Sequence, residues 1–195
     1  RPADQRRRRA MSFLGQNFRL SELNGALVLA QLRKRDRILA RTRAIKRRLW
    51  DACEAAFGPE AMETNHDREG DCGIGLTVFR DSPEAAKELC RLLQAEGVRC
   101  GTRFSKDVPD RHMFYHWNYI LEKRTPHRNG FPWRGQEAPC RVEYDPASCP
   151  QMIHWMERAV IFPITQRMSD AYVRQVCAAI RKVGRRMPRT GSGDR

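Results

Sequence analysis

The sequence predicts an α/β protein, with one long amphipathic helix followed by a small domain that mixes strands and helices. Residues 21–57 contain no proline, and their apolar side chains recur at steps of three, four and seven, as on one helical stripe. Residues 73–104 show strand, helix and strand patterns with short joints, which is the order of an α/β crossover unit. A buried strand pattern at 160–163 and a second amphipathic helix at 173–183 complete the small domain.

The long helix is predicted to start at Ser21, whose hydroxyl can accept a hydrogen bond from an unpaired backbone amide, and to end at Gly58 and Pro59. At 1.5 Å per residue it would be about 55 Å long, too long for one small domain to cover. We therefore expect it to span two units or to pack against a partner, and we expect the isolated chain to self-associate or to be poorly soluble. Its apolar stripe comprises Leu20, Leu23, Leu27, Ala30, Ile38, Ile45, Leu49, Ala52 and Ala56.

The small domain is predicted to begin with a half-buried strand at residues 73–79, where positions 74, 76 and 78 are apolar. Ser82 and Pro83 supply a cap and a first-turn proline for the next helix, which Gly97 ends. Residues 98–104 form the second predicted strand.

The region from 105 to 150 holds most of the prolines and aromatic residues without a sustained period. A loop of this length inside a compact domain is usually functional or mobile, and we expect the same here. A short helix is predicted at 151–158, and Ser169 is predicted to cap the last helix.

The seven cysteines include no Cys-x-x-Cys pair, so neither a disulfide framework nor a zinc ribbon is indicated. Reduced thiols in a cytoplasmic protein are the simpler interpretation. No apolar run approaches the roughly 20 residues that span a bilayer, so no membrane insertion is predicted. Four cysteines in or beside apolar elements are predicted to be small core residues: Cys72, Cys90, Cys100 and Cys177.

The net charge of +14 is concentrated in three clusters. Residues 1–9 carry five arginines against one aspartate, residues 33–48 carry nine basic residues against one, and residues 181–195 carry six against one. The middle cluster lies on the long helix. Basic clusters with basic tails and nearby aromatics are typical of nucleic-acid binding. The alternative is a solvated helix face, which the absence of any named nucleic-acid motif favours.

Three blocks of sequence carry a resemblance to a known family. The first is Gly-Gln-Asn-Phe-Arg-Leu-Ser-Glu-Leu at 15–23, the second is the helix and strand pattern at 86–104, and the third is Arg-Ala-Val-Ile-Phe-Pro-Ile at 158–164 with Met-Ser-Asp at 168–170. In this order they resemble the pyridoxal-phosphate-dependent sugar aminotransferases of the DegT and StrS type. One such block is a weak signal, but three in the same order are a strong one.

The resemblance implies a long connecting helix and the small C-terminal domain of a pyridoxal-phosphate-dependent transferase fold, with the large catalytic domain missing. It assigns residues 1–20 to a basic segment and the end of the signature loop, 21–57 to the connecting helix, 58–187 to the small α/β domain and 188–195 to a flexible tail.

The same resemblance implies that the Schiff-base lysine lies upstream of the signature, in a Ser-Phe-x-x-x-Lys context. No lysine of this chain stands in that context, so no catalytic residue is assigned and we expect the chain alone not to transaminate. The lysines are Lys34, Lys46, Lys87, Lys106, Lys123 and Lys182.

Individual side chains also receive implied roles. Asn17 holds the position of the asparagine that, in these homodimers, donates a hydrogen bond to the phosphate of the neighbouring subunit's pyridoxal 5'-phosphate. Arg19 holds the family's arginine position, where it would contact phosphate or substrate or, as we favour, form an interdomain ion pair. His112, His116 and Trp117 lie in the loop that approaches the sugar, although this loop departs from the commoner family pattern.

Simpler interpretations exist for the same residues. Without the family, Asn17 would be a residue that caps a turn or the following helix. His112 and His116 are four apart and would share a helix face as metal ligands do, but no third ligand is evident, so no metal is predicted.

The predicted function is transfer of an amino group, with glutamate as donor by family analogy, to a keto sugar that is often nucleotide-linked. Amino-sugar, cell-surface polysaccharide or antibiotic biosynthesis would use it. The alternative is a basic interaction module that binds nucleic acid or an acidic partner, and a third possibility is a remnant without activity. Because the sequence begins at Arg1, we expect a fragment or the C-terminal portion of a longer product.

Overall fold

The computed structural model describes residues 20–103, 113–125, 128–134 and 142–187, together with residues 189 and 191. The chain divides into two compact units, Arg1–Ile38 and Leu39–Arg195. In the first unit the described residues form helix α2 and the start of helix α3. The second unit holds the rest of α3, the three strands and the remaining helices.

Two helices occupy the region that the sequence predicts as one. Helix α2 runs Glu22–Leu32 and α3 runs Arg35–Phe57, with a two-residue turn between them. The prediction of one continuous helix over 21–57 is therefore wrong at this turn. Four of the five residues at 33–37 are cations that repel one another, and α2 has no buried residue whose packing would offset that repulsion.

The N-terminal cap of α2 is the one predicted. The Ser21 Oγ accepts a hydrogen bond from the backbone N–H of Asn24 at 3.2 Å. The predicted apolar stripe, however, is buried only along α3: Leu23 on α2 is 81% exposed, whereas Ile45 and Leu49 on α3 are 1% exposed. Helical spacing thus identified the stripe, and the packing of α3 in the second unit decided which part of it is covered.

Among the described residues the sheet has three strands in the order β1-β3-β2: β1 spans Gly75–Phe79, β2 spans Gly101–Thr102 and β3 spans Ala159–Pro163. Both outer strands pair antiparallel with β3, so β1 and β2 run in the same direction, as the predicted crossover unit requires. Leu76 lies opposite Phe162 and Val78 opposite Val160, and these four side chains form the buried face. The last strand along the chain therefore inserts between the two strands of the crossover.

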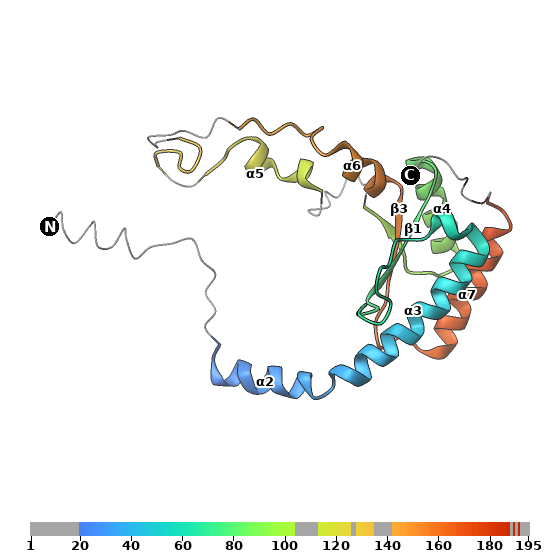
Figure 1. Ribbon diagram of the computed structural model, residues 1–195. Helices are drawn as coiled ribbons and strands as arrows, with labels where there is room; N and C mark the ends of the chain where they lie inside the picture. The colour runs from blue at the N-terminus through green and yellow to red at the C-terminus, as the bar shows by residue number, and fades with distance from the viewer. Residues whose placement is uncertain are drawn as a thin grey trace. The chain divides into compact units, whose positions relative to one another are not determined.

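Helices α4, Pro83–Ala95, and α7, Asp170–Gly184, pack on this sheet with α3, and Figure 1 shows all three on the same side of the strands. The caps are the predicted ones, because Ser82 Oγ accepts from the backbone N–H of Ala85 and Ser169 Oγ accepts from that of Tyr172. The largest fully buried side chains include Phe57, Phe162, Ile45, Leu49, Leu76, Leu89, Leu93 and Ile180.

Shorter elements complete the described part of the chain. They are the 3-10 turns η1, Pro59–Ala61, and η2, Phe114–His116, and the helices α5, Asn118–Leu121, and α6, Pro150–Glu157. The ring of Trp155 on α6 meets the ring of Phe79 on β1 edge to face, with 5.3 Å between centroids. This contact covers part of the sheet face opposite the core.

Two predicted core residues are not buried. Ile74 is 70% exposed because it precedes β1 and the pleat that buries Leu76 and Val78 begins only at Gly75. Cys72 is also exposed, since it lies in the loop before the strand. Within the described ranges, no helix combines the length and the apolarity needed to cross a bilayer.

Candidate functional site

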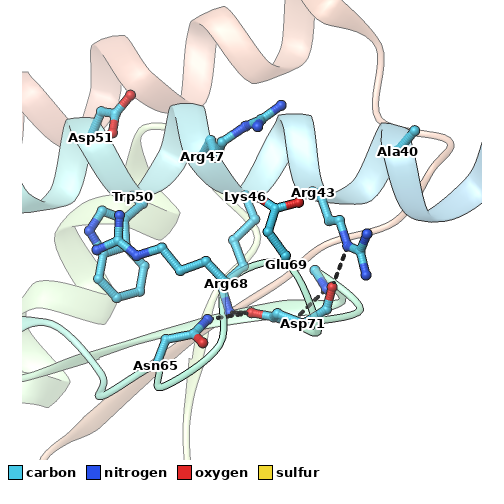
Figure 2. A pocket seen from close by; sticks show the side chains of 11 residues that line it. Ala40, Arg43, Lys46, Arg47, Trp50, Asp51, Asn65, Arg68, Glu69 and Asp71 are labelled. Carbon is cyan, nitrogen blue, oxygen red and sulfur yellow. Dashed lines mark hydrogen bonds and ion pairs between the residues drawn. The ribbon is translucent and has the colours of Figure 1, made fainter.

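A cavity of about 310 Å³ lies between one face of α3 and the loop at residues 65–73. The side chains of Arg43, Lys46 and Trp50 point from α3 toward this loop, as Figure 2 shows. Because these positions and Ala40 are three or four residues apart, α3 presents them on one face. The full lining is Ala40, Arg43, Lys46, Arg47, Trp50, Asp51, Asn65, Arg68, Glu69, Asp71 and Gly73.

The loop is shaped by its own short polar side chains. Asp67 Oδ1 accepts hydrogen bonds from the backbone N–H groups of Glu69 and Gly70, at 3.0 and 2.8 Å. Asn65 Oδ1 accepts in turn from the backbone N–H of Asp67 at 3.2 Å. Such side-chain to backbone bonds are the reason that Asn and Asp favour turns. They hold Arg68 and Glu69 at the cavity.

The end of the loop docks directly on the backbone of α3. The Thr42 hydroxyl donates to the carbonyl oxygen of Cys72 at 2.7 Å, and Arg43 Nε donates to that of Asp71 at 2.6 Å. Gly73 has φ +67, and a Cβ there would lie 2.8 Å from the backbone nitrogen of Arg43. Only glycine allows this approach without strain.

Lys46 forms the electrostatic centre of the site, with its side chain only 11% exposed. Its Nζ lies 2.6 Å from Glu63 Oε1 and 2.5 Å from Asp71 Oδ2. Both carboxylates accept further bonds, Glu63 Oε2 from the backbone N–H of Thr77 and Asp71 Oδ1 from that of Gly73. One ammonium group therefore joins α3 to the strand and to the loop.

The pKa shifts of this cluster favour the ionised forms. Burial lowers the pKa of Lys46, but the hydrogen bonds and charges of Asp71 and Glu63 outweigh burial and raise the pKa above its ordinary value. Burial likewise raises the pKa of Asp71, but the bonds from Lys46, the Gly73 amide and Asn65 bring the net pKa below its ordinary value. Lys46 is thus a protonated structural cation.

The indole ring of Trp50 forms part of the cavity wall. Trp50 is 7% exposed, and the guanidinium carbon of Arg68 lies 4.6 Å from the ring centroid, a cation–π contact. Figure 2 shows the Arg68 side chain extending along the loop to reach this ring. The contact places a guanidinium at the cavity wall.

The cavity offers groups of both charges to a ligand. The guanidinium groups of Arg43, Arg47 and Arg68 can donate to an anionic group, and the carboxylates of Asp51 and Glu69 can accept from a donor. This mixture suits a small polar ligand that carries both kinds of group.

The residues that the sequence assigns to function are only partly described. Asn17, Arg19 and His112 lie outside the described residues. His116 ends the 3-10 turn η2, with its ring 4.5 Å from the ring of Tyr115 between centroids. Trp117 follows it and is 37% exposed. Neither His116 nor Trp117 lines the cavity on α3.

The sequence interpretation missed this cavity. A signal was present, since Ala40, Arg43, Arg47 and Trp50 recur at helical spacing and an Asn-x-Asp turn signal begins at Asn65. Nothing in either pattern shows that the two segments meet. In the part of the chain that the structure describes, no three His, Cys, Asp or Glu residues are grouped to hold a metal ion.

A model of the DegT/DnrJ/EryC1/StrS aminotransferase family matches residues 1–140 of the 195-residue chain. The matched region includes the signature at 15–23, both helices α2 and α3, and the β1–α4–β2 crossover. It also contains all residues that line the cavity on α3.

Proposed function

This chain belongs to the DegT/DnrJ/EryC1/StrS aminotransferase family, and from that membership we propose that the complete protein transfers an amino group from glutamate to a keto sugar. The family match over residues 1–140 is the observation that carries the proposal. The keto sugar is often nucleotide-linked in this family, and amino-sugar, polysaccharide or antibiotic biosynthesis would use its product. Pyridoxal 5'-phosphate, when bound, supplies the electron sink for the transfer.

Lys46, the buried lysine of α3, does not fit the role of the lysine that binds the cofactor. Lys46 is held protonated between Glu63 and Asp71, whereas a Schiff base forms from the neutral amine. Since no lysine of this chain stands in the family's Ser-Phe-x-x-x-Lys context, we assign the Schiff-base lysine to sequence upstream of the signature at 15–23 in the complete protein. On this proposal the present chain supplies binding and positioning groups and is inactive alone.

Asn17 is the binding group that we assign with most chemical reason. Its side-chain amide is an uncharged group that can donate a hydrogen bond to a phosphate oxygen without transferring a proton to it. We propose that it serves the cofactor of the neighbouring subunit in a homodimer. Arg19, two residues further, would form an interdomain ion pair or contact the phosphate.

The sugar side of the site is assigned to the segment around η2. Trp117 exposes more than a third of its surface, and a flat indole is suited to packing on a sugar ring. His116 precedes it on the same turn, and His112 would approach from the segment before it. These assignments rest on family position together with the exposure of Trp117.

The alternative of a nucleic-acid-binding module is weakened by how the basic residues of α3 are used. Arg41 pairs with Asp170 at 2.9 Å and donates to the Met168 carbonyl, and Arg48 lies 3.5 Å from the same carboxylate. Lys46 is engaged as described above. Phosphate binding needs cations that are free to face a phosphate together, and each of these three is paired with a carboxylate of the protein.

The isolated chain is expected to form no specific cofactor adduct. When it is mixed with pyridoxal 5'-phosphate and the product is reduced and mapped by peptide mass, labelling should spread over exposed lysines without saturating at one per chain. Stoichiometric labelling of a single lysine, with amino transfer from glutamate, would show that this chain has a complete site.

Replacement of Asn17 by alanine in the full-length protein is expected to raise the dissociation constant for pyridoxal 5'-phosphate by roughly tenfold, since a hydrogen bond to a charged group is worth about 1.5 kcal/mol or more. Equilibrium dialysis of the cofactor measures this. Asn24, exposed on α2, is the matched control, and Asn24→Ala should leave the constant unchanged. Equal affinities for Asn17→Ala and wild type would remove Asn17 from the cofactor site.

A further inference from the structure

Two cysteine side chains meet where α4 and the start of β2 come together. The Sγ atoms of Cys90 and Cys100, which are ten positions apart in the sequence, lie 3.8 Å apart. We propose that Cys90 and Cys100 are a covalent modification site, a dithiol that a hydroperoxide oxidises to an intramolecular disulfide. The inference is independent of the proposed amino transfer, because neither residue lines the cavity on α3 or belongs to the signature.

The fold itself brings the two thiols together. Cys90 stands on the buried face of α4 with Ala86, Leu89 and Leu93, and the chain reverses at Gly97, which has φ +78. The reversal is fixed by backbone bonds at the helix end, including Val98 N–H to the carbonyl of Leu93 at 3.0 Å. The residues after Gly97 therefore run back alongside α4.

Cys100 is then held against α4 by its own backbone and side chain. The Gln94 Nε2 donates to the Cys100 carbonyl at 3.0 Å. The Cys100 thiol points at Cys90, with its Sγ 3.7 Å from the Cys90 carbonyl oxygen and 3.8 Å from the Cys90 sulfur. A disulfide needs its sulfurs about 2.0 Å apart, so closure requires the two sulfurs to approach by about 1.8 Å.

The pair differs chemically from the other buried thiols. The hydrogen bond from Cys100 lowers the pKa of Cys90 to about 7, although burial acts in the opposite direction. The same bond raises the pKa of Cys100, which keeps its proton. Burial raises the pKa of Cys53 and of Cys177. Because the thiolate is the nucleophile, Cys90 is the sulfur that attacks first.

The partial exposure of the two cysteines also suits reaction with a small oxidant. Cys90 is 7% exposed, and Cys100 beside it is half-buried, so the edge of the pair reaches solvent. The fully buried Cys53 offers no comparable entry.

The oxidation balances with a hydroperoxide as the only co-reactant. The Cys90 thiolate attacks one peroxide oxygen, so that a sulfur–oxygen bond forms, the oxygen–oxygen bond breaks and the departing alkoxide takes the Cys100 proton. The Cys100 sulfur then attacks Cys90 Sγ, forming the disulfide and releasing hydroxide, which leaves as water with the proton that Cys90 had given up. Two thiols and one hydroperoxide thus give one disulfide, one alcohol and one water, and two electrons pass from sulfur to oxygen.

The test treats the wild-type chain with hydrogen peroxide, blocks the remaining thiols and maps tryptic peptides by mass. Cleavage after Lys87, Arg91, Arg99 and Arg103 would release Cys90 and Cys100 on separate four-residue peptides, 88–91 and 100–103. We expect these two peptides to be joined, with a mass lower by two hydrogens than their sum. We also expect Cys90 to lose its free thiol more than about tenfold faster than Cys53 or Cys177, because burial keeps the pKa values of those two thiols above the ordinary value and leaves little thiolate.

Variants separate this reaction from unrelated oxidation. A background in which Cys72, Cys140 and Cys149 are serine removes three other thiols that could join two chains, and the linkage should persist in it. Cys100→Ser should abolish the linked peptides and let Cys90 proceed to the sulfinic acid. Linkage of Cys90 to another cysteine, or free Cys90 and Cys100 thiols after the other cysteines are oxidised, would overturn the proposal. The wild-type map decides this even if a variant fails to fold.

Discussion

Replacing Lys46 with methionine is expected to lower the free energy of unfolding by about 3 kcal/mol. Methionine keeps the aliphatic part of the side chain but removes the ammonium that Glu63 and Asp71 share at 2.6 and 2.5 Å. Breaking a buried ion pair from one side costs about 3–5 kcal/mol because a desolvated charge is left behind, and the partial exposure of these carboxylates places the effect at the lower end. Urea unfolding of both proteins measures the difference.

A matched control lies next to Lys46 in the sequence. Arg47 is exposed on the same helix, so Arg47→Met should change the free energy of unfolding by less than about 0.5 kcal/mol. If Lys46→Met were no more destabilising than Arg47→Met, the three-residue cluster would not stabilise the attachment of the loop to α3.

The pH dependence of the Lys46→Met effect follows from the two pKa shifts. The pKa of Asp71 is below 3.8 in the folded state, so its contribution is complete above the unfolded value and is lost as pH falls through the folded pKa. The pKa of Lys46 is above 10.5, so its contribution is complete below 10.5 and is lost as pH rises through the folded pKa. The difference between wild type and variant should therefore be flat from about pH 5 to 9 and shrink on either side.

Replacing Gly73 with alanine is expected to cost a similar amount, about 3 kcal/mol. The positive φ of +67 alone costs an L-residue about 1–2 kcal/mol. The new Cβ would also lie 2.8 Å from the backbone nitrogen of Arg43 and from the carbonyl carbon of Thr42, and neither backbone atom can rotate away. The loop must then shift and lose the bonds by which it docks on α3.

Alanine substitutions at two other glycines help to separate the two contributions to this loss of stability, which are backbone strain and steric overlap. Gly58 has φ 95 and ψ 158, a region that is essentially open only to glycine, and a Cβ added there would meet no atom within 4 Å, so Gly58→Ala reports backbone strain alone, about 1–3 kcal/mol. Gly101 has open space and no positive φ, so Gly101→Ala should be close to neutral. A Gly73→Ala cost no larger than the about 1–2 kcal/mol expected from its positive φ alone would mean that the close approach to α3 contributes nothing.

Short-range features of the fold were predictable from the sequence because their causes lie within a few residues. Ser21, Ser82 and Ser169 cap helices through bonds to the backbone three residues ahead, and Gly97 reverses the chain after α4. The family resemblance was readable for the same reason, since its first block is one continuous run at 15–23. The prediction failed where a local pattern was extended over too many residues, as in the single helix predicted over 21–57.

What the sequence alone determined, then, is most of the longer helices and strands, the caps at Ser21, Ser82 and Ser169, and the family. Tertiary structure alone decided that Leu49 is buried while Leu23 is exposed, that β3 lies between β1 and β2, and that Lys46 sits between two carboxylates. It also decided that the loop at 65–73 closes a cavity on α3. Each of these depends on residues that are distant in sequence, and local spacing carries no information on which distant segments will meet.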